Sequence, residues 1–317
     1  MAWLQIGMCF LLLFTSESYA TPKPVIINLS NDFIPVLDGL KNGTHEQQRS
    51  AWNTFEAKHQ ALFDEVIFKK GVSGWKDRRE KMISNLLNRL PALDGQIRIL
   101  IDAAETSLTD SIEKFKSKVP DFNGQYSIYL VPSQLTFNAK VVYWKNELVL
   151  LLAPDSMANL NEDVKDLQLI LAHELFHIHH ETLQPESYTM AKPFWFEGCA
   201  TWASGQIISG FTDAQLLMEE KIGKRCEDSA YVKNLAQEYL EVLPLSTKSR
   251  AAILPIYTEW FSYNPSASPK DPSRKGYCLG LRVVKELAKK YSMQEFLSMD
   301  EVQYWELIRI TLQEMTK

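Results

Sequence analysis

Apolar residues recur at helical spacing through the first third of the chain, behind a signal for the start of a helix. Thr44 and Gln47 stand three residues apart, which is the spacing of a capping box, in which each side chain bonds the other residue's backbone N–H. The apolar stripe behind this box consists of Trp52, Phe55, Leu62, Phe63, Val66 and Ile67. This spacing predicts a helix that continues to about Lys70, just before Gly71.

Two more helices are predicted in the same region. One covers residues 75–90 and is ended by Pro91, because proline lacks the N–H that a helix interior requires. The other runs from about residue 94 to residue 118. Residues 21–41 are mixed in polarity and contain prolines, so they predict an irregular surface segment. We therefore expect residues 21–120 to form a helical N-terminal region.

The pattern then changes to short runs rich in β-branched and aromatic residues. Such runs cover residues 125–131, 139–144 and 147–152. Lys145 and Asn146 separate the last two runs and suit a tight hairpin turn. These runs predict a small, mainly antiparallel sheet.

The helix predicted after this sheet begins near Asn161 and is apolar on several sides. Its apolar residues include Leu167, Ile170, Leu171, Leu175 and Ile178. A helix of this kind is buried rather than amphipathic. Further helices are predicted towards the C-terminus, with capping signals at Thr212, Ser292 and Ser298, while residues 262–274 form a loop rich in proline and serine. The chain therefore predicts an α+β fold that is mostly helical, with a helical C-terminal lobe.

The buried helix carries an HExxH array of His173, Glu174 and His177. Residues four apart on a helix lie on one face, so the two imidazoles can bind one metal ion while Glu174 reaches a water beside it. Burying such groups without partners would cost several kcal/mol, and a divalent metal satisfies them together. The array predicts one catalytic Zn²⁺, with Glu174 as general base.

A catalytic zinc needs a third protein ligand from outside this pair. Glu197 is a lone carboxylate in the apolar stretch PFWFEGCATW, 20 residues after His177, and such a carboxylate needs a cation. His180 lies on the same face as His173 and His177. Ligands at i, i+4 and i+7 span roughly 10 Å of a straight helix, however, so the three imidazoles cannot converge. Glu197 is the predicted third ligand, and His179 and His180 are expected to support the ligands or to lie at the surface.

The HExxH array and the FEGCA stretch resemble the gluzincin group of metallopeptidases, and in particular a set of bacterial predicted zinc-dependent proteases of unknown function. The resemblance covers roughly residues 125–290. It implies a zincin-like metallopeptidase domain over residues 121–317, with His173, His177 and Glu197 as zinc ligands. It also implies that Tyr277, in a Tyr-x-x-Gly that opens a later helix, stabilises the oxyanion; the other possibility is a core tyrosine. An extended substrate could then pair with a strand beside the metal.

Composition, charge and the N-terminal residues indicate which partners and which cellular location to expect. The chain has 317 residues, 45% of them hydrophobic, and a net charge of −5 without a basic surplus, so nucleic acid is not an expected partner. Residues 3–14 are apolar but too few to span a bilayer, and Ser18-Tyr19-Ala20 fits a cleavage site. We expect residues 1–20 to be a signal peptide, with a retained anchor as the alternative. The mature protein would then be periplasmic or secreted, without a stable membrane span.

Three cysteines follow the predicted signal peptide: Cys199, Cys226 and Cys278. They are too few for a disulfide scaffold, and one pair could bridge, but the sequence does not indicate which pair.

The sequence therefore predicts an exported zinc-dependent peptidase that hydrolyses peptide bonds of a peptide or protein substrate. Two alternatives remain at this point. One is a non-catalytic zinc-binding or interaction protein on the same scaffold. The other is a helical binding module in which the HExxH array is incidental.

Overall fold

A computed structural model of the chain describes residues 24–39, 43–122, 126–183, 187–264 and 266–317, and the predicted signal peptide lies outside these ranges. The first half contains β1 (Val25–Asn28), α1 (Ser30–Gly39), α2 (His45–Lys58), α3 (Gln60–Leu62), η1 (Phe63–Ile67), α4 (Trp75–Lys118), β2 (Ser127–Leu130), β3 (Ala139–Trp144), β4 (Glu147–Leu152) and α5 (Pro154–Asn159). The second half contains α6 (Val164–Leu183), α7 (Ala191–Ile207), α8 (Asp213–Leu216), α9 (Glu220–Cys226), α10 (Ser229–Val242), α11 (Arg250–Phe261), α12 (Lys275–Leu287), α13 (Met293–Ser298) and α14 (Glu301–Met315).

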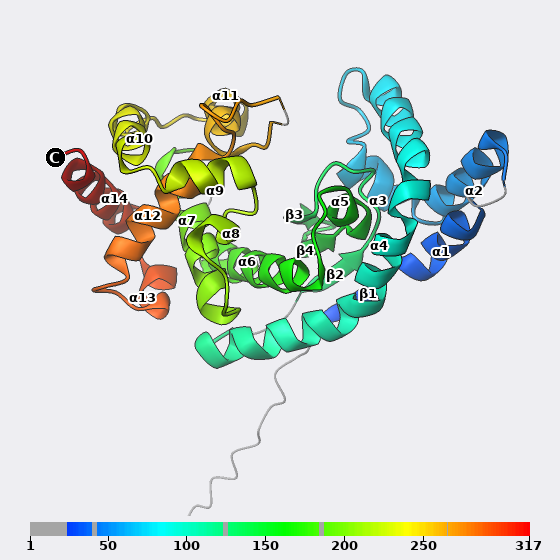
Figure 1. Cartoon of the computed structure of the whole chain (residues 1–317), viewed down its shortest axis with the longest axis horizontal. Helices are drawn as coiled ribbons and strands as arrows, with labels where there is room; N and C mark the ends of the chain where they lie inside the picture. The colour runs from blue at the N-terminus through cyan, green and yellow to red at the C-terminus, as the bar shows by residue number, and fades with distance from the viewer. Residues whose placement is uncertain (1–23, 40–42, 123–125, 184–186, 265) are drawn as a thin grey trace, which may run out of the picture.

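The molecule is mostly helical with one small sheet, as predicted. Helices α1 and α2 lie on one side and helices α10, α12, α13 and α14 on the other, with the sheet and α6 between them, while the long α4 runs from the side of α1 and α2 beneath the sheet and α6 (Figure 1). No helix in the described part of the chain is long and apolar enough to cross a membrane.

The sheet is mixed, so the prediction of a mainly antiparallel sheet was wrong. Its strand order is β1-β2-β4-β3, and the β1–β2 and β2–β4 pairings are parallel. The β3–β4 hairpin has the predicted bounds and is antiparallel, with Lys145 and Asn146 both at positive φ as a tight turn requires. The error arose because β1 comes from residues 21–41, which were expected to be irregular. β1 pairs with β2, which lies about a hundred residues later in the chain, and no pattern within either segment indicates this pairing.

Strand β3 forms one edge of the sheet, because β4 is its one partner strand among the described residues. An edge strand presents a row of backbone groups that a further strand can bind.

In the N-terminal region the predicted break at Pro91 is absent, and residues 75–118 form the single helix α4. A proline inside a helix costs about 3 kcal/mol through its lost N–H and steric clash. The helix nevertheless continues because its apolar stripe is buried on both sides of Pro91, at Leu86, Leu87, Leu90, Ile97 and Leu100. This packing outweighs the local penalty. The capping box of Thr44 and Gln47 is confirmed at the start of α2.

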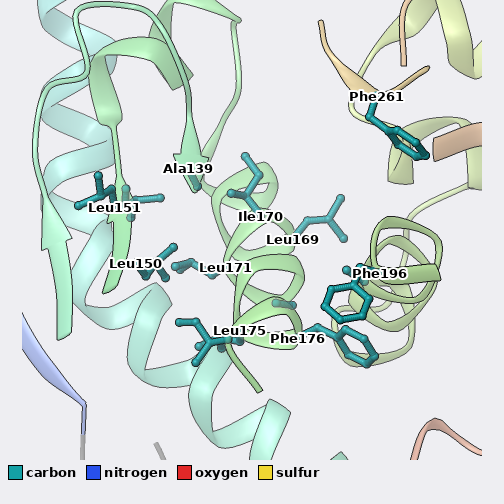
Figure 2. Packing of buried hydrophobic residues seen from close by; sticks show 14 of the residues in the cluster. Ala139, Leu150, Leu151, Leu169, Ile170, Leu171, Leu175, Phe176, Phe196 and Phe261 are labelled. Atoms are coloured by element: carbon teal, nitrogen blue, oxygen red, sulfur yellow. The ribbon is translucent and has the colours of Figure 1, made fainter. Parts of the chain in front are cut away.

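Helix α6 lies between the sheet and α7 and is buried on most sides. Figure 2 shows Leu150 of β4 beside Leu171 and Leu175 of α6, with Phe196 of α7 on the opposite side of the helix. The helix starts later than predicted, because Asp163, rather than Asn161, accepts hydrogen bonds from the N–H groups of Lys165 and Asp166. The predicted burial of this helix is confirmed, and its few polar groups are therefore held in fixed positions.

A disulfide joins two helices of the C-terminal half. Cys226 at the end of α9 forms this bond with Cys278 in α12, and Cys199 is free and buried.

The capping boxes of the C-terminal half were predicted in part. The predicted capping box of Ser298 and Glu301 was wrong by two residues, since Asp300 and Gln303 form the box that starts α14. The box at Ser292 and the cap at Thr212 are confirmed.

Candidate metal centre

The structure brings His173, His177 and Glu197 to one point. The Nε2 atoms of the two histidines are 3.0 Å apart, and the Glu197 Oε2 atom lies 3.2 Å from His177 Nε2 and 3.3 Å from His173 Nε2. His173 and His177 come from α6, and Glu197 comes from α7, which packs against it. Among the described residues, this is the group of three whose ligand atoms are placed to hold a metal ion.

These distances fit a tetrahedral zinc ion. Ligand atoms bound to zinc at about 2.0–2.1 Å lie roughly 3.3 Å from one another in a tetrahedron, close to the three separations observed. Without a cation, any placement of protons on two neutral rings leaves either two N–H groups or two lone pairs facing each other among these three atoms. A cation at their centre satisfies all three. The donor set of two imidazoles and one carboxylate is one that zinc prefers.

The charges of the three groups also favour a cation. Burial lowers the pKa of His173 to about 4, which keeps this imidazole neutral. Burial opposes charge on His177 as well, but the adjacent Glu197 carboxylate raises the pKa of His177 to about 9. Burial would raise the pKa of Glu197, yet the charge of His177 and hydrogen bonds from both histidines hold it well below its ordinary value. At neutral pH the positive charge of His177 and the negative charge of Glu197 therefore cancel, and a divalent cation would displace the proton that His177 carries.

Glu197 is held in place by a close crossing of α7 and α12. A Cβ atom added to Gly198 would lie 2.8 Å from the carbonyl carbon of Gly280, a distance that real Cβ atoms do not adopt. Only glycine at both positions allows the two backbones to touch here. Because Gly280 lies one helical turn after Tyr277, the same crossing brings Tyr277 to the metal centre.

Glu174 stands beside the triad, in a cleft of about 1070 Å³. Burial raises the pKa of its carboxyl to about 7, and the charge of His177 acts in the opposite direction. The backbone N–H of Val141, on the edge strand β3, faces the Glu174 carboxylate and acts to lower its pKa. The predicted base therefore lies between the three candidate ligands and the open edge of the sheet.

Tyr277 lies over His173, with its ring nearly parallel to the imidazole at a centroid distance of 6.2 Å. Burial raises the pKa of the Tyr277 hydroxyl, and so does the Glu197 carboxylate within hydrogen-bonding reach of it. The hydroxyl therefore contacts a candidate ligand as well as facing the cleft. This placement is compatible with the predicted oxyanion role and adds a second role, that of orienting Glu197.

Two residues at the centre were missed from the sequence. Tyr257 of α11 lines the cleft, and its hydroxyl is close enough to Glu197 for that charge, after burial, to raise its pKa. Arg274 places its guanidinium 4.0 Å from the Tyr277 ring centroid and donates to the backbone carbonyl of Leu217. Tyr257 lies 60 residues from Glu197 and Arg274 ends a proline-rich loop, so neither carries a local signal.

His179 and His180 are buried and lie outside the triad. The His180 ring stacks on Phe196 at 3.9 Å, and His179 Nε2 lies 3.5 Å from Asp121, so the expectation of a surface position was wrong. Both are packed because α6 is buried on nearly every side. Asp166, which precedes both candidate histidine ligands on α6, accepts from the N–H of Asp163 at the start of the helix.

The cleft extends from the metal centre along β3 on one wall and along α11 on the other. Its lining includes all six residues of β3, the segment around Val66 and Lys69, and Arg250, Ile253 and Tyr257 from α11. The cleft therefore has room for an extended chain beside an unpaired strand edge.

Comparison of the chain with models of protein families, with curated proteins and with solved structures finds no match.

Proposed function

We propose that this protein is a zinc-dependent peptidase. The observation that supports this most strongly is the convergence of His173, His177 and Glu197 beside Glu174, within a cleft bordered by the edge strand β3. A purely structural zinc site closes its fourth position and needs no base, whereas this centre faces a large cleft and has a carboxylate beside it. The alternative of a non-catalytic zinc protein therefore leaves Glu174 without a role.

The zinc ion that these three ligands would hold supplies Lewis acidity, which lowers the pKa of water towards 7 and polarises the scissile carbonyl. Glu174 accepts the proton of the attacking water and donates it to the leaving amine. A group that performs both steps needs a pKa near the working pH, and that of Glu174 is raised to about 7. Tyr257 and Tyr277 line the cleft, and their hydroxyls are the groups that we propose as hydrogen-bond donors to the developing oxyanion.

The substrate would bind as an extended strand along β3. Backbone groups at an open sheet edge bind a peptide through main-chain hydrogen bonds, which fix its direction without selecting its sequence. Because the Val141 N–H already faces Glu174, a peptide on this edge would place its own backbone next to the base. This arrangement favours an internal peptide bond of an extended segment over a bond in a folded structure.

The test compares wild type with Glu174→Gln. Purified zinc-loaded wild type should hydrolyse casein or a peptide library, and Glu174→Gln should reduce kcat/KM by about 10²–10⁴-fold while binding zinc as before. Equal hydrolysis by the two proteins would refute the mechanism. Hydrolysis by neither would favour the non-catalytic alternative.

We also propose that the protein is exported. The apolar run at residues 3–14 motivates this, and the disulfide between Cys226 and Cys278 supports it independently, because structural disulfides persist in oxidising compartments. Expression of the full chain followed by N-terminal sequencing of the exported fraction tests the proposal. Export with a new N-terminus near residue 21 is expected, and retention of Met1 in a reducing compartment would contradict it.

A further inference from the structure

The wall of the cleft formed by β3 carries positive charges that have no acidic partner. Lys69 and Lys140 both line the cleft, and neither forms an ion pair within the described part of the chain. Of the acidic side chains nearby, Glu65 accepts a hydrogen bond from the Trp144 indole and Asp64 pairs with Lys70, and neither lies within ion-pair distance of Lys69 or Lys140. Two unpaired ammonium groups on one wall are a feature that the peptidase proposal does not itself explain.

Lys69 and Lys140 line the same cleft from two different elements. Side chains alternate along a strand, so Lys140, Val142 and Trp144 of β3 point to one face of the sheet. The hydrogen bond between Trp144 and Glu65 shows that η1 lies against this face, and Lys69 follows Glu65 by about one turn. The two ammonium groups are close enough for Lys69 to disfavour the charge on Lys140, whose pKa falls to about 8, mainly through burial.

The ammonium of Lys140 is half-buried and packed rather than extended into solvent. It lies 3.9 Å from the centroid of the Phe137 ring. Lys145 adds a third positive charge at the same wall, with its ammonium 4.4 Å from the Trp144 ring. Like charges held close together without an anion raise the free energy of the folded protein. An anion bound from outside the chain would lower it.

We infer that Lys69 and Lys140 form a subsite for a carboxylate of the peptide substrate, so that the enzyme prefers acidic segments. This inference rests on the proposed function, since it assigns the substrate class of the same cleft. A peptide paired with β3 places alternate side chains on the face of Lys69 and Lys140, while the others face α6 and the metal centre. The carboxylate could come from a Glu or Asp side chain or from the end of a chain.

The test measures binding and does not depend on hydrolysis. Three fluorescein-labelled peptides of equal length are titrated into zinc-loaded Glu174→Gln protein: one with glutamates at alternate positions and an amidated C-terminus, its glutamine counterpart, and the glutamine peptide with a free C-terminus. The glutamate peptide should bind about five- to tenfold more tightly than its glutamine counterpart at low salt, and the difference should shrink as salt is added.

Removing the two ammonium groups should abolish this difference. Lys69→Met/Lys140→Met should bring the ratio of the two affinities to about one. Lys81→Met/Lys114→Met, which removes two exposed charges from α4 outside the cleft, should leave the ratio unchanged. Lys140→Arg keeps the charge and should keep the preference. If the double variant does not fold, Lys69→Met alone, at an exposed position, should still reduce the ratio.

The outcomes separate the two proposals. A glutamate preference that persists in the folded Lys69→Met/Lys140→Met protein, or equal binding of all three peptides, overturns the carboxylate subsite even if wild type hydrolyses peptides. Tighter binding of only the peptide with a free C-terminus supports the subsite and assigns the carboxylate to a chain end. A lysine-dependent preference without any hydrolysis by wild type supports the subsite and overturns the peptidase mechanism.

Discussion

Gly198 of α7 and Gly280 of α12 touch through their backbones, next to the candidate ligand Glu197. A Cβ atom on Gly198 would come within 2.9 Å of three backbone atoms of Gly280. These atoms belong to the helix backbone, so they cannot move aside as a flexible side chain would. The position of Glu197 therefore depends on this crossing.

We expect Gly198→Ala to lower the free energy of unfolding by about 1–3 kcal/mol, because overpacking forces the two helices apart. It should also weaken zinc binding, since Glu197 moves with α7. Gly95→Ala is the matched control: a Cβ there meets nothing within 4 Å, and alanine in a helix should stabilise α4 by up to about 1 kcal/mol. Thermal unfolding and zinc titration of both variants check this, and a Gly198→Ala protein as stable as Gly95→Ala would refute it.

Zinc content should depend on all three candidate ligands. Wild type is expected to retain one equivalent of zinc after dialysis, while His173→Ala and Glu197→Gln should each weaken binding by about 100-fold or more, because a three-ligand site becomes a two-ligand site. His45→Ala, which changes an exposed histidine in α2, should retain the metal. Metal analysis after dialysis measures this. Stoichiometric zinc in both ligand variants would show that the metal binds elsewhere.

Substitution of Tyr257 and substitution of Tyr277 should differ in their effects on zinc binding and on catalysis. Tyr277→Phe removes a hydroxyl within reach of Glu197, so it should weaken zinc binding by about tenfold as well as lower kcat. Tyr257→Phe should leave zinc affinity unchanged and lower kcat/KM by about 10²-fold, if its hydroxyl is the donor to the oxyanion. Comparing kcat, KM and zinc affinity for both variants makes the distinction. A Tyr257→Phe enzyme with full activity would remove Tyr257 from the mechanism.

Glu162 should make stability fall as pH rises. It is buried, Asn138 donates to one carboxylate oxygen, and the other oxygen has no partner within the described residues. Burial raises its pKa in the folded protein from 4.5 to about 8. The native state therefore keeps a proton that the unfolded chain releases, and stability declines between about pH 4.5 and pH 8.

Glu162→Gln removes this ionisation and keeps the acceptor for Asn138. It should be more stable than wild type at pH 8.5, by on the order of a few kcal/mol, and similar to it at pH 5. Urea unfolding at the two pH values measures the difference. The exposed Glu113→Gln serves as the control and should show the pH dependence of wild type. A constant difference across the pH range would contradict the assignment.

The disulfide should contribute to stability. Cys226 and Cys278 are 52 residues apart, and closing a loop of this length reduces the entropy of the unfolded chain by an amount worth about 4 kcal/mol in the loop-closure model. Cys226→Ser/Cys278→Ser should therefore lower the free energy of unfolding by about 2–4 kcal/mol. Cys199→Ser changes the free buried thiol and provides the comparison. An unchanged unfolding midpoint for wild type in strong reductant would show that the bridge does not stabilise the fold.

The sequence predicted those parts of the fold that depend on neighbouring residues. The bounds of the β3–β4 hairpin, the capping box at Thr44 and the burial of α6 each follow from spacing within a few residues. Proximity on one helix likewise brings the side chains of His173 and His177 together, because i and i+4 share a face of the helix.

The tertiary structure decided the features that join distant segments. The parallel pairing of β1, the passage of α4 through Pro91, the bridge from Cys226 to Cys278, and the approach of Tyr257 to the metal centre all depend on packing between segments. The same holds for the unpaired charges of Lys69 and Lys140, which lie 71 positions apart in the sequence. Local spacing therefore predicted the pair of candidate metal ligands on α6, and long-range packing placed the remaining groups around it.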